Sequence, residues 1–141
     1  MMGRVSRSGF VFRTVWLVIL LILLQGCTSK SGPEYLEIKG LNQDEQEIVQ
    51  LINKRMQYLH EGNAEEYMKL FAPNSPITGM PTYQLKAVKL HTPIHIQEQK
   101  KGYQVLLLAD DMLTNDDFFT SQYVFIKGKD PDSKWLIYDI D

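Results

Sequence analysis

The histidines are the first residues to consider for metal or acid–base chemistry, and the chain has three, His60, His91 and His95. His91 and His95 lie four residues apart, which on a strand places them on one face but about 13 Å apart. A zinc ion needs its ligands within about 2.3 Å, so this pair does not chelate one metal unless Pro93 folds the strand sharply. His60 falls at the end of a predicted helix, where a cation is favourable. We therefore expect solvent-facing or structural histidines and no metal site.

The acidic residues form adjacent pairs, Asp110-Asp111 and Asp116-Asp117. Neighbouring residues on a strand point to opposite faces, so a pair on a strand separates rather than converges. A calcium loop needs acids at alternating positions, a glycine and a terminal glutamate, and no window supplies that set. The run Asp130-Pro131-Asp132-Ser133 is typical of a turn. We expect all of these acids in solvated turns.

General acid–base catalysis inside a pocket would need a carboxylate base and a tyrosine donor that converge. Asp110 or Asp139 could supply the base, but no spacing selects a pair. The candidate donors are Tyr67, Tyr83, Tyr103, Tyr123 and Tyr138. The sequence also contains no nucleophile elbow, glycine-rich phosphate loop or Ser-His-Asp order. We predict no catalytic residue and no cofactor, and hence a protein that is not an enzyme; the alternative is a small hydrolase or isomerase.

The N-terminal segment has the composition of an export signal. Ten apolar residues, Val15 to Leu24, follow a start that carries Arg4, Arg7 and Arg13 but no acid. A cationic start, an apolar stretch of 7–15 residues and a small residue before the cleavage site define a secretory signal peptide. A membrane-spanning helix would need about 20 apolar residues. This segment is therefore predicted to direct export and to lie outside the fold.

The residues Leu24-Gln25-Gly26-Cys27 resemble the lipobox of bacterial lipoproteins. The resemblance implies that residues 1–26 are a signal peptide, cleaved between Gly26 and Cys27, and that Cys27 carries a diacylglyceryl group, often with a further acyl chain such as palmitate. Two or three chains hold a protein stably on a membrane. It also implies the extracytoplasmic face of the cell membrane, or the outer membrane in a source with two membranes. The alternative is ordinary secretion with an incidental thiol.

The part from Cys27 to Asp141 has the length of one domain. The chain has 15 basic and 17 acidic residues, and the three arginines ahead of Cys27 leave with the signal, so this part carries 12 − 17 = −5. That charge disfavours nucleic acid as a partner. Residues 27–41 are polar and broken by Gly32-Pro33, which predicts a lipidated tether. Tyr35, Leu36 and Ile38 form either a short docking segment or part of a disordered tether.

Two helices are predicted at the start of the domain. Asn42 and Glu45 form a capping box, and apolar residues at helical spacing continue to about His60. Gly62-Asn63 ends this helix, and Asn63 begins a second one that stops before Pro73. The first stripe is Ile48, Leu51, Ile52, Met56 and Leu59, and the second is Ala64, Tyr67, Met68, Leu70 and Phe71. The sequence therefore predicts a helical hairpin with an apolar face.

The rest of the chain has the alternation of strands. The four predicted strands are Tyr83–Gln97, Tyr103–Leu113, Phe119–Lys127 and Trp135–Ile140. Short, turn-rich connections favour antiparallel neighbours. Pro93 cannot donate to a ladder, which indicates a bend or bulge in a first strand at the sheet edge. A helical hairpin followed by an antiparallel meander predicts an α+β fold.

This arrangement over residues 42–141 resembles the nuclear transport factor 2-like superfamily, a cone-shaped α+β fold. The resemblance rests on Ile48-Val49-Gln50-Leu51-Ile52, on Tyr67-Met68-Lys69-Leu70-Phe71-Ala72-Pro73 and on Trp135-Leu136-Ile137-Tyr138-Asp139-Ile140. It implies a curved four-stranded sheet whose concave side holds the helices and a pocket. The superfamily includes enzymes, ligand-binding domains and noncatalytic modules, so the fold alone does not determine the function.

Both faces of the predicted sheet are apolar, because Leu106 and Leu108 alternate with Val105 and Leu107. An antiparallel sheet usually has one polar face. The hypothesis is that a second copy or an envelope protein covers the outer face; otherwise the segment near Leu36 covers it. We expect a lipid-anchored extracytoplasmic accessory module that binds a partner protein or a small apolar ligand.

Overall fold

The computed structural model describes residues 32–141, and Gly32–Asp141 forms one compact unit. The predicted signal peptide, its cleavage site after Gly26 and the lipidation residue Cys27 lie outside the described residues. None of the helices within residues 32–141 is long and apolar enough to cross a membrane.

The long helix α2, Gln43–Glu61, begins and ends where the sequence predicts. The Asn42 side chain accepts from the Glu45 amide and the Glu45 carboxylate accepts from the Asn42 amide, so the capping box is confirmed. Gly62 ends the helix with a left-handed φ of 68°, a conformation that glycine adopts without steric cost. Its backbone N–H donates to the Tyr58 carbonyl.

The second helix, α3 (Ala64–Met68), is shorter than predicted, although Asn63 caps it as expected. The chain leaves the helix because it pairs with a strand instead. The Ile137 amide donates to the Leu70 carbonyl at 2.9 Å, and the Ala72 amide donates to the Ile137 carbonyl at 2.8 Å. The predicted hairpin is therefore a long helix followed by little more than one turn.

The sheet is antiparallel throughout, with strand order β1-β3-β4-β5 and with β2 also paired to β3. Its strands are β1 (Leu85–Leu90), β2 (Gln97–Gln99), β3 (Gly102–Leu113), β4 (Phe118–Gly128) and β5 (Leu136–Ile140). The α+β class is thus confirmed, but with five strands rather than four. The predicted strand Tyr83–Gln97 is wrong as one element: it breaks on both sides of Pro93 into β1 and β2, which pair with different parts of β3.

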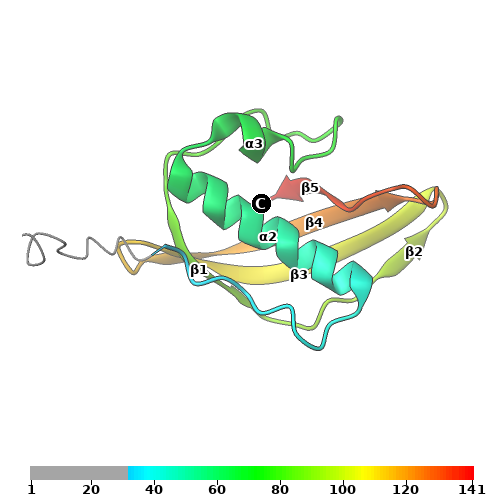
Figure 1. Cartoon of the computed structure of the whole chain (residues 1–141), viewed down its shortest axis with the longest axis horizontal. Coiled ribbons are helices and arrows are strands. Elements are labelled where there is room, and N and C mark those ends of the chain that lie inside the picture. The colour runs from blue at the N-terminus through cyan, green and yellow to red at the C-terminus, as the bar shows by residue number, and fades with distance from the viewer. Residues whose placement is uncertain (1–31) are drawn as a thin grey trace, which may run out of the picture. The chain divides into compact units, whose positions relative to one another are not determined.

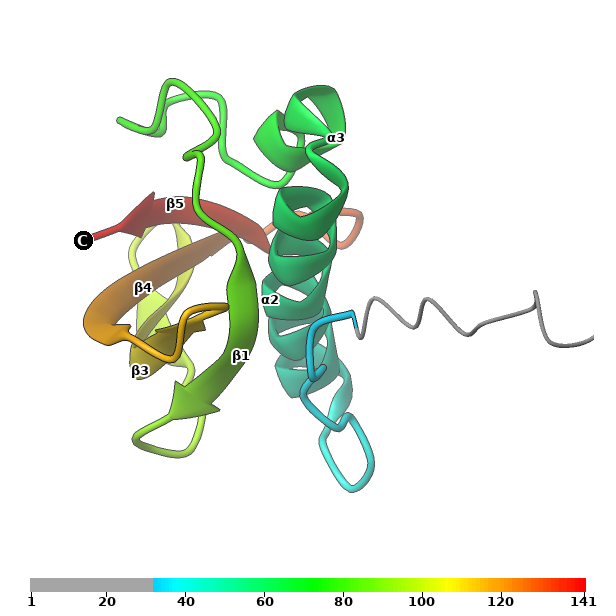
Figure 2. The same ribbon diagram turned by 90° about the vertical axis from the view of Figure 1, so that its left-hand side faces the viewer.

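The core lies between α2 and the inner face of the sheet (Figures 1 and 2). Helix α2 crosses one face of the strands, and the edge-on view in Figure 2 shows the opposite face without a covering element from the described part of the chain. Each apolar stripe predicted from the sequence contributes to this core. The largest fully buried apolar side chains are Tyr123, Phe125, Ile48, Ile52, Met56, Leu85, Leu107 and Ile137.

The segment ahead of α2 is docked rather than free. Glu34 forms a parallel bridge with Ala87 of β1, and its amide donates to the Lys86 carbonyl at 2.8 Å. Leu36 is held by the Asn53 side chain, which accepts from its amide at 2.8 Å and donates to its carbonyl at 2.9 Å. Because Glu34 extends the sheet at its β1 edge and Leu36 lies against α2, neither contact covers the outer face of the sheet.

Candidate functional site

A buried polar cluster interrupts the core where α2 crosses β3 and β4. Arg55 of α2 is 1% exposed and Asp111 of β3 is fully buried. Arg55 lies within the apolar stripe of α2, next to Ile52 and Met56 and one turn before Leu59. Asp111 continues the inward-facing series of β3 after Ala109, because alternate residues of a strand share a face. The fold therefore forces a cation and an anion to face each other in the core.

The cluster is closed by short hydrogen bonds. Arg55 Nη1 donates to Asp111 Oδ2 at 3.0 Å and to the Tyr123 hydroxyl at 2.5 Å. The Tyr123 hydroxyl donates to Asp111 Oδ1 at 2.5 Å. Ser121, the inward neighbour of Tyr123 on β4, donates to Asp111 Oδ2 at 3.3 Å. The Asp111 carboxylate thus accepts from three side chains, and the guanidinium also stacks over the Tyr123 ring at 5.2 Å.

The guanidinium has one further contact, and one of its three nitrogens has none. Arg55 Nη2 donates to the Tyr83 hydroxyl at 2.9 Å. Arg55 Nε is buried and has no hydrogen-bond partner among residues 32–141. An unsatisfied buried donor costs about 1–3 kcal/mol, and buried polar groups in native proteins usually have partners. Nε is therefore the one buried side-chain nitrogen or oxygen of this cluster that has no partner at all among residues 32–141.

The cluster keeps its groups in fixed protonation states. Burial alone would lower the pKa of Arg55, but Tyr123 and Asp111 beside it outweigh that effect and raise the pKa above its ordinary value. Burial raises the pKa of Tyr123 well above 10, and Asp111 raises it further against the opposing effect of Arg55. Burial also raises the pKa of Tyr83, again opposed by Arg55. Arg55 remains charged and both tyrosines remain protonated around neutral pH.

Chemically, the arrangement suits positioning better than proton transfer. A general base needs a lone pair free for substrate, whereas the Asp111 carboxylate is already bound by three donors. The carboxylates that the sequence suggested as bases, Asp110 and Asp139, do not join Tyr83 and Tyr123. Asp110 points outward and accepts from Thr120, and the Asp139 carboxylate accepts from the Ile140 amide.

The expectation of solvated turns is wrong for Asp110 and Asp111, which both lie on β3. The expected separation of this pair onto opposite faces is confirmed, because Asp111 is buried while Asp110 bonds to side chains of the outer face. Asp116 and Asp117 do lie in the β3–β4 turn, where Asp116 pairs with Lys86. The sequence pattern did indicate that Asp111 is buried, because alternate residues of a strand share a face and Asp111 falls on the same face as Val105, Leu107 and Ala109.

The histidines lie apart from this cluster. His91 and His95 are not on a strand as expected, since both fall in the connection between β1 and β2. His91 Nε2 lies 2.9 Å from Asp110 Oδ1, and together with Thr120 it lowers the pKa of that carboxyl. His60 is in the last turn of α2. Residues 32–141 contain no group of three or more histidine, cysteine or acidic side chains placed to hold a metal.

A cavity of about 420 Å³ adjoins the buried cluster. Arg55, Tyr67 and Tyr83 form its polar side, and Ile77, Met80 and Ile140 form its apolar side. The segment that joins α3 to β1 forms one wall of this open cavity, and this segment lies on the β5 side of the molecule in Figures 1 and 2. The cavity therefore places Arg55 and Tyr83 next to apolar surface.

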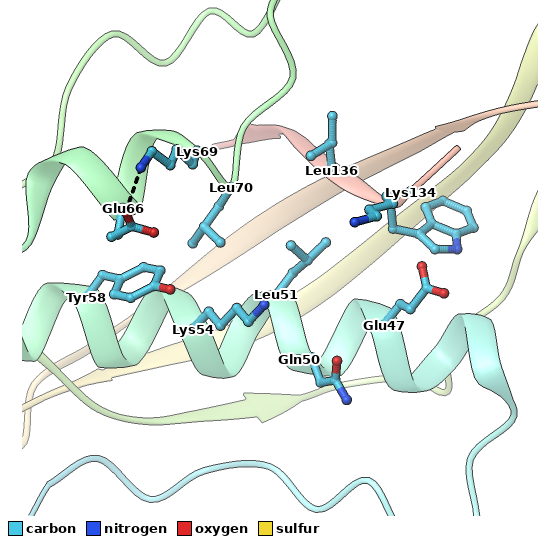
Figure 3. A pocket seen from close by; sticks show the side chains of 11 residues that line it. Glu47, Gln50, Leu51, Lys54, Tyr58, Glu66, Lys69, Leu70, Lys134 and Leu136 are labelled. Carbon is cyan, nitrogen blue, oxygen red and sulfur yellow. Dashed lines mark hydrogen bonds and ion pairs between the residues drawn. The ribbon is translucent and has the colours of Figure 1, made fainter. Parts of the chain in front are cut away.

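A second hollow, of about 400 Å³, lies between three parts of the chain: α2, the end of α3 with the residues that follow it, and the start of β5 (Figure 3). Its floor contains Leu51 and Leu70, and Lys54 and Lys134 extend over it from opposite sides. Lys69 is engaged with Glu66 at 2.6 Å and with Glu65 at 3.1 Å. This groove has a solvated rim of mixed charge and no buried polar group, so it is the weaker candidate.

The outer face of the sheet presents four apolar side chains, which we call the outer strip: Leu106, Leu108, Val124 and Ile126. Gln122 lies opposite Leu108 and Gln104 lies opposite Ile126, so the strip is interrupted by polar residues. Leu106 is 42% exposed and Leu108 is 46% exposed. Leu106 is paired directly with Val124, and Ile126 lies on the same face of β4. Phe118, 65% exposed, lies at the far end of this face. The expected placement of Leu106 and Leu108 on the face opposite Val105 and Leu107 is therefore confirmed, but that face is only partly apolar.

Comparison of the chain with protein-family models, with curated proteins and with solved structures gives no match.

Proposed function

We propose that the chain is a lipid-anchored extracytoplasmic binding module of a bacterial cell envelope, built on a cone of the nuclear transport factor 2-like type, and that it engages a partner protein through the outer strip. The observation that carries this proposal is the exposure of Leu106 and Leu108 on the outer face of the sheet, where Val124 lies directly opposite Leu106. Clustered exposed apolar side chains mark interaction sites more often than scattered ones do. The closed Arg55–Asp111 cluster supports a noncatalytic role.

The partner is a different protein rather than a second copy. The segment from Cys27 onward carries a net charge of −5, from 12 basic and 17 acidic residues. Net charge far from zero disfavours self-association. A partner with an apolar strip and a basic surround complements both features of this chain, since apolar contact supplies binding energy and opposite charge supplies the rate of encounter.

The mechanism is placement near the membrane. The docked Glu34 lies seven residues after Cys27, and a fully extended chain covers about 3.3–3.6 Å per residue, so the lipid attachment point lies within about 25 Å of the domain. Such a short tether raises the effective concentration of the domain at partners near the same membrane surface. Because the segment 34–38 is bound to the domain, this tether is shorter than the tether of residues 27–41 that the sequence predicted.

The anchor is tested by growing cells with a clickable fatty acid and measuring the mass and membrane partitioning of the wild type and of Cys27→Ala. We expect label and membrane retention in the wild type and loss of both in Cys27→Ala. An unlabelled, freely released wild type would exclude the lipid anchor.

The partner surface is tested by placing a photo-crosslinking amino acid at position 108 in cells, with position 64 as the matched control because Ala64 is exposed on α3. We expect one discrete adduct from position 108 that is absent from position 64 and is weakened by Leu106→Ser. An adduct of twice the chain's mass would instead identify a second copy. Equal adducts from both positions would contradict the proposal.

A further inference from the structure

We infer that the cavity beside Arg55 binds a small molecule with a compact apolar body and one carbonyl or carboxylate oxygen, which accepts hydrogen bonds from Arg55 Nε–H and from the Tyr83 hydroxyl. The cavity lies on the helix-covered side of the sheet, whereas the outer strip lies on the opposite face. This inference therefore stands or falls separately from the proposed partner surface.

The first argument is the state of the guanidinium. Arg55 is 1% exposed, and its two terminal nitrogens are held by Asp111, Tyr123 and Tyr83. These contacts fix the orientation of the whole planar group, so Nε–H cannot turn toward another acceptor. Nε has no partner within residues 32–141, and Arg55 lines the cavity. A fixed and unsatisfied donor at a cavity is complementary to an acceptor atom.

The second argument is the state of Tyr83, which also lines the cavity. Its hydroxyl oxygen accepts from Arg55 Nη2 at 2.9 Å, and none of the hydrogen bonds formed within residues 32–141 has this hydroxyl as the donor. Its pKa is raised by burial, so the proton stays on the oxygen around neutral pH. Its edge-to-face packing against Phe119, with ring centroids 5.4 Å apart, fixes the ring. Arg55 and Tyr83, which both line the cavity, therefore each have a donor hydrogen without an acceptor among residues 32–141.

The ligand class follows from charge and shape. Asp111 neutralises Arg55, so the site has no excess charge that would require an anion, and a neutral carbonyl satisfies both donors as a carboxylate does. Ile77, Met80 and Ile140 supply apolar contacts for the rest of the molecule. A cavity of about 420 Å³ falls within the range of sites that enclose small ligands. A ligand whose polar group only donates hydrogen bonds is excluded because it would face two donors.

The test uses three probes with the same ring: cyclohexanone, cyclohexanecarboxylate and cyclohexylammonium. Each is titrated into the isotopically labelled full chain in lipid nanodiscs, and the Nε–H resonance of Arg55 is followed by NMR. We expect saturable shifts with one or both acceptor probes and none with cyclohexylammonium. The tighter of the two acceptors distinguishes a neutral carbonyl ligand from an anionic one. No saturable shift with either acceptor, or equal shifts with cyclohexylammonium, would overturn the inference.

The matched variants are Tyr83→Phe, which removes the second donor and keeps the ring, and Tyr103→Phe, which removes a half-buried hydroxyl on β3 that does not line the cavity. Loss of one hydrogen bond predicts about 2- to 12-fold weaker probe binding for Tyr83→Phe and no change for Tyr103→Phe. The wild-type Nε–H titration does not depend on how well either variant folds. Unchanged affinity in a folded Tyr83→Phe protein would remove Tyr83 from the site and contradict the inference.

Discussion

Removal of the negative charge of Asp111 is the sharpest test of the buried cluster. In Asp111→Asn the shape of the side chain is kept, but Arg55 remains charged, 1% exposed and without a counterion. The new amide NH2 would also replace one carboxylate oxygen, so it would oppose either the Tyr123 hydroxyl at Oδ1 or both Arg55 and Ser121 at Oδ2. The substitution therefore leaves both an uncompensated charge and opposed donors in the core.

The expected loss is about 3–5 kcal/mol of unfolding free energy, the range for breaking one partner out of a buried ion pair. Native domains have only about 5–15 kcal/mol in total, so the loss consumes a large share of it. For a domain of about 100 residues, roughly 4 °C of melting temperature corresponds to each kcal/mol, which gives a decrease of about 12–20 °C.

The assay is urea unfolding followed by the fluorescence of Trp135, which is 3% exposed in the native state. The matched control is Asp110→Asn, one residue away on the outer face, where solvent replaces the lost contacts with Thr120 and His91. The double variant with Arg55→Met should recover part of the loss, because it removes the unpaired charge. Equal losses for the two aspartates, or strict additivity in the double variant, would refute the buried ion pair.

Three further predictions concern backbone approach, docking and pH. Gly102→Ala should lose about 1–3 kcal/mol of unfolding free energy, because an added Cβ would lie 2.2 Å from the Lys127 carbonyl oxygen. The control Gly79→Ala should be tolerated, because nothing lies within 4 Å of its added Cβ. Urea unfolding compares the two variants, and equal losses would contradict the strand register. Asn53→Ala should lose about 1–3 kcal/mol through its two bonds to the docked segment and should speed amide exchange there; unchanged exchange would contradict docking. Hydrogen bonds from Lys127 and then Trp135 lower the pKa of Asp44 from 3.8 in the folded protein. Asp44 therefore stabilises the fold fully above pH 3.8, and this stabilisation is lost as the pH falls through the lower folded pKa. Acid titrations of unfolding should therefore be flatter for Asp44→Asn, and identical acid limbs would contradict this contribution.

Much of the fold was predictable because it depends on local signals. The capping box at Asn42 and the left-handed Gly62 define the ends of α2, and strict alternation identified β3 and β4 to within a residue at each end. The break at Pro93 was read only as a bend, because the sequence cannot show that the segments before and after it pair with separate parts of β3. The length of α3 was overestimated, because the pairing of Leu70 and Ala72 with β5 is a tertiary contact.

The candidate site was the part that pattern reasoning missed. Its clue was present: Arg55 occupies a core position of the helical stripe, and Asp111 has the parity of the buried residues of β3. What periodicity lacks is pairing, because Arg55 and Asp111 are 56 residues apart and Arg55 and Tyr123 are 68 apart. Only the crossing of α2 over β3 and β4 shows that these charges compensate each other.

The sequence by itself determined the α+β class, the caps of the long helix, the alternating faces of β3 and β4 and the net charge, because each depends on residues close together in the chain or on composition alone. The tertiary structure decided which apolar face is covered, where the segment around Leu36 docks and that Arg55, Asp111, Tyr83 and Tyr123 form one cluster beside a cavity. These features depend on which surfaces meet when the helix packs on the sheet, and burial energy selects that packing only for the folded chain as a whole.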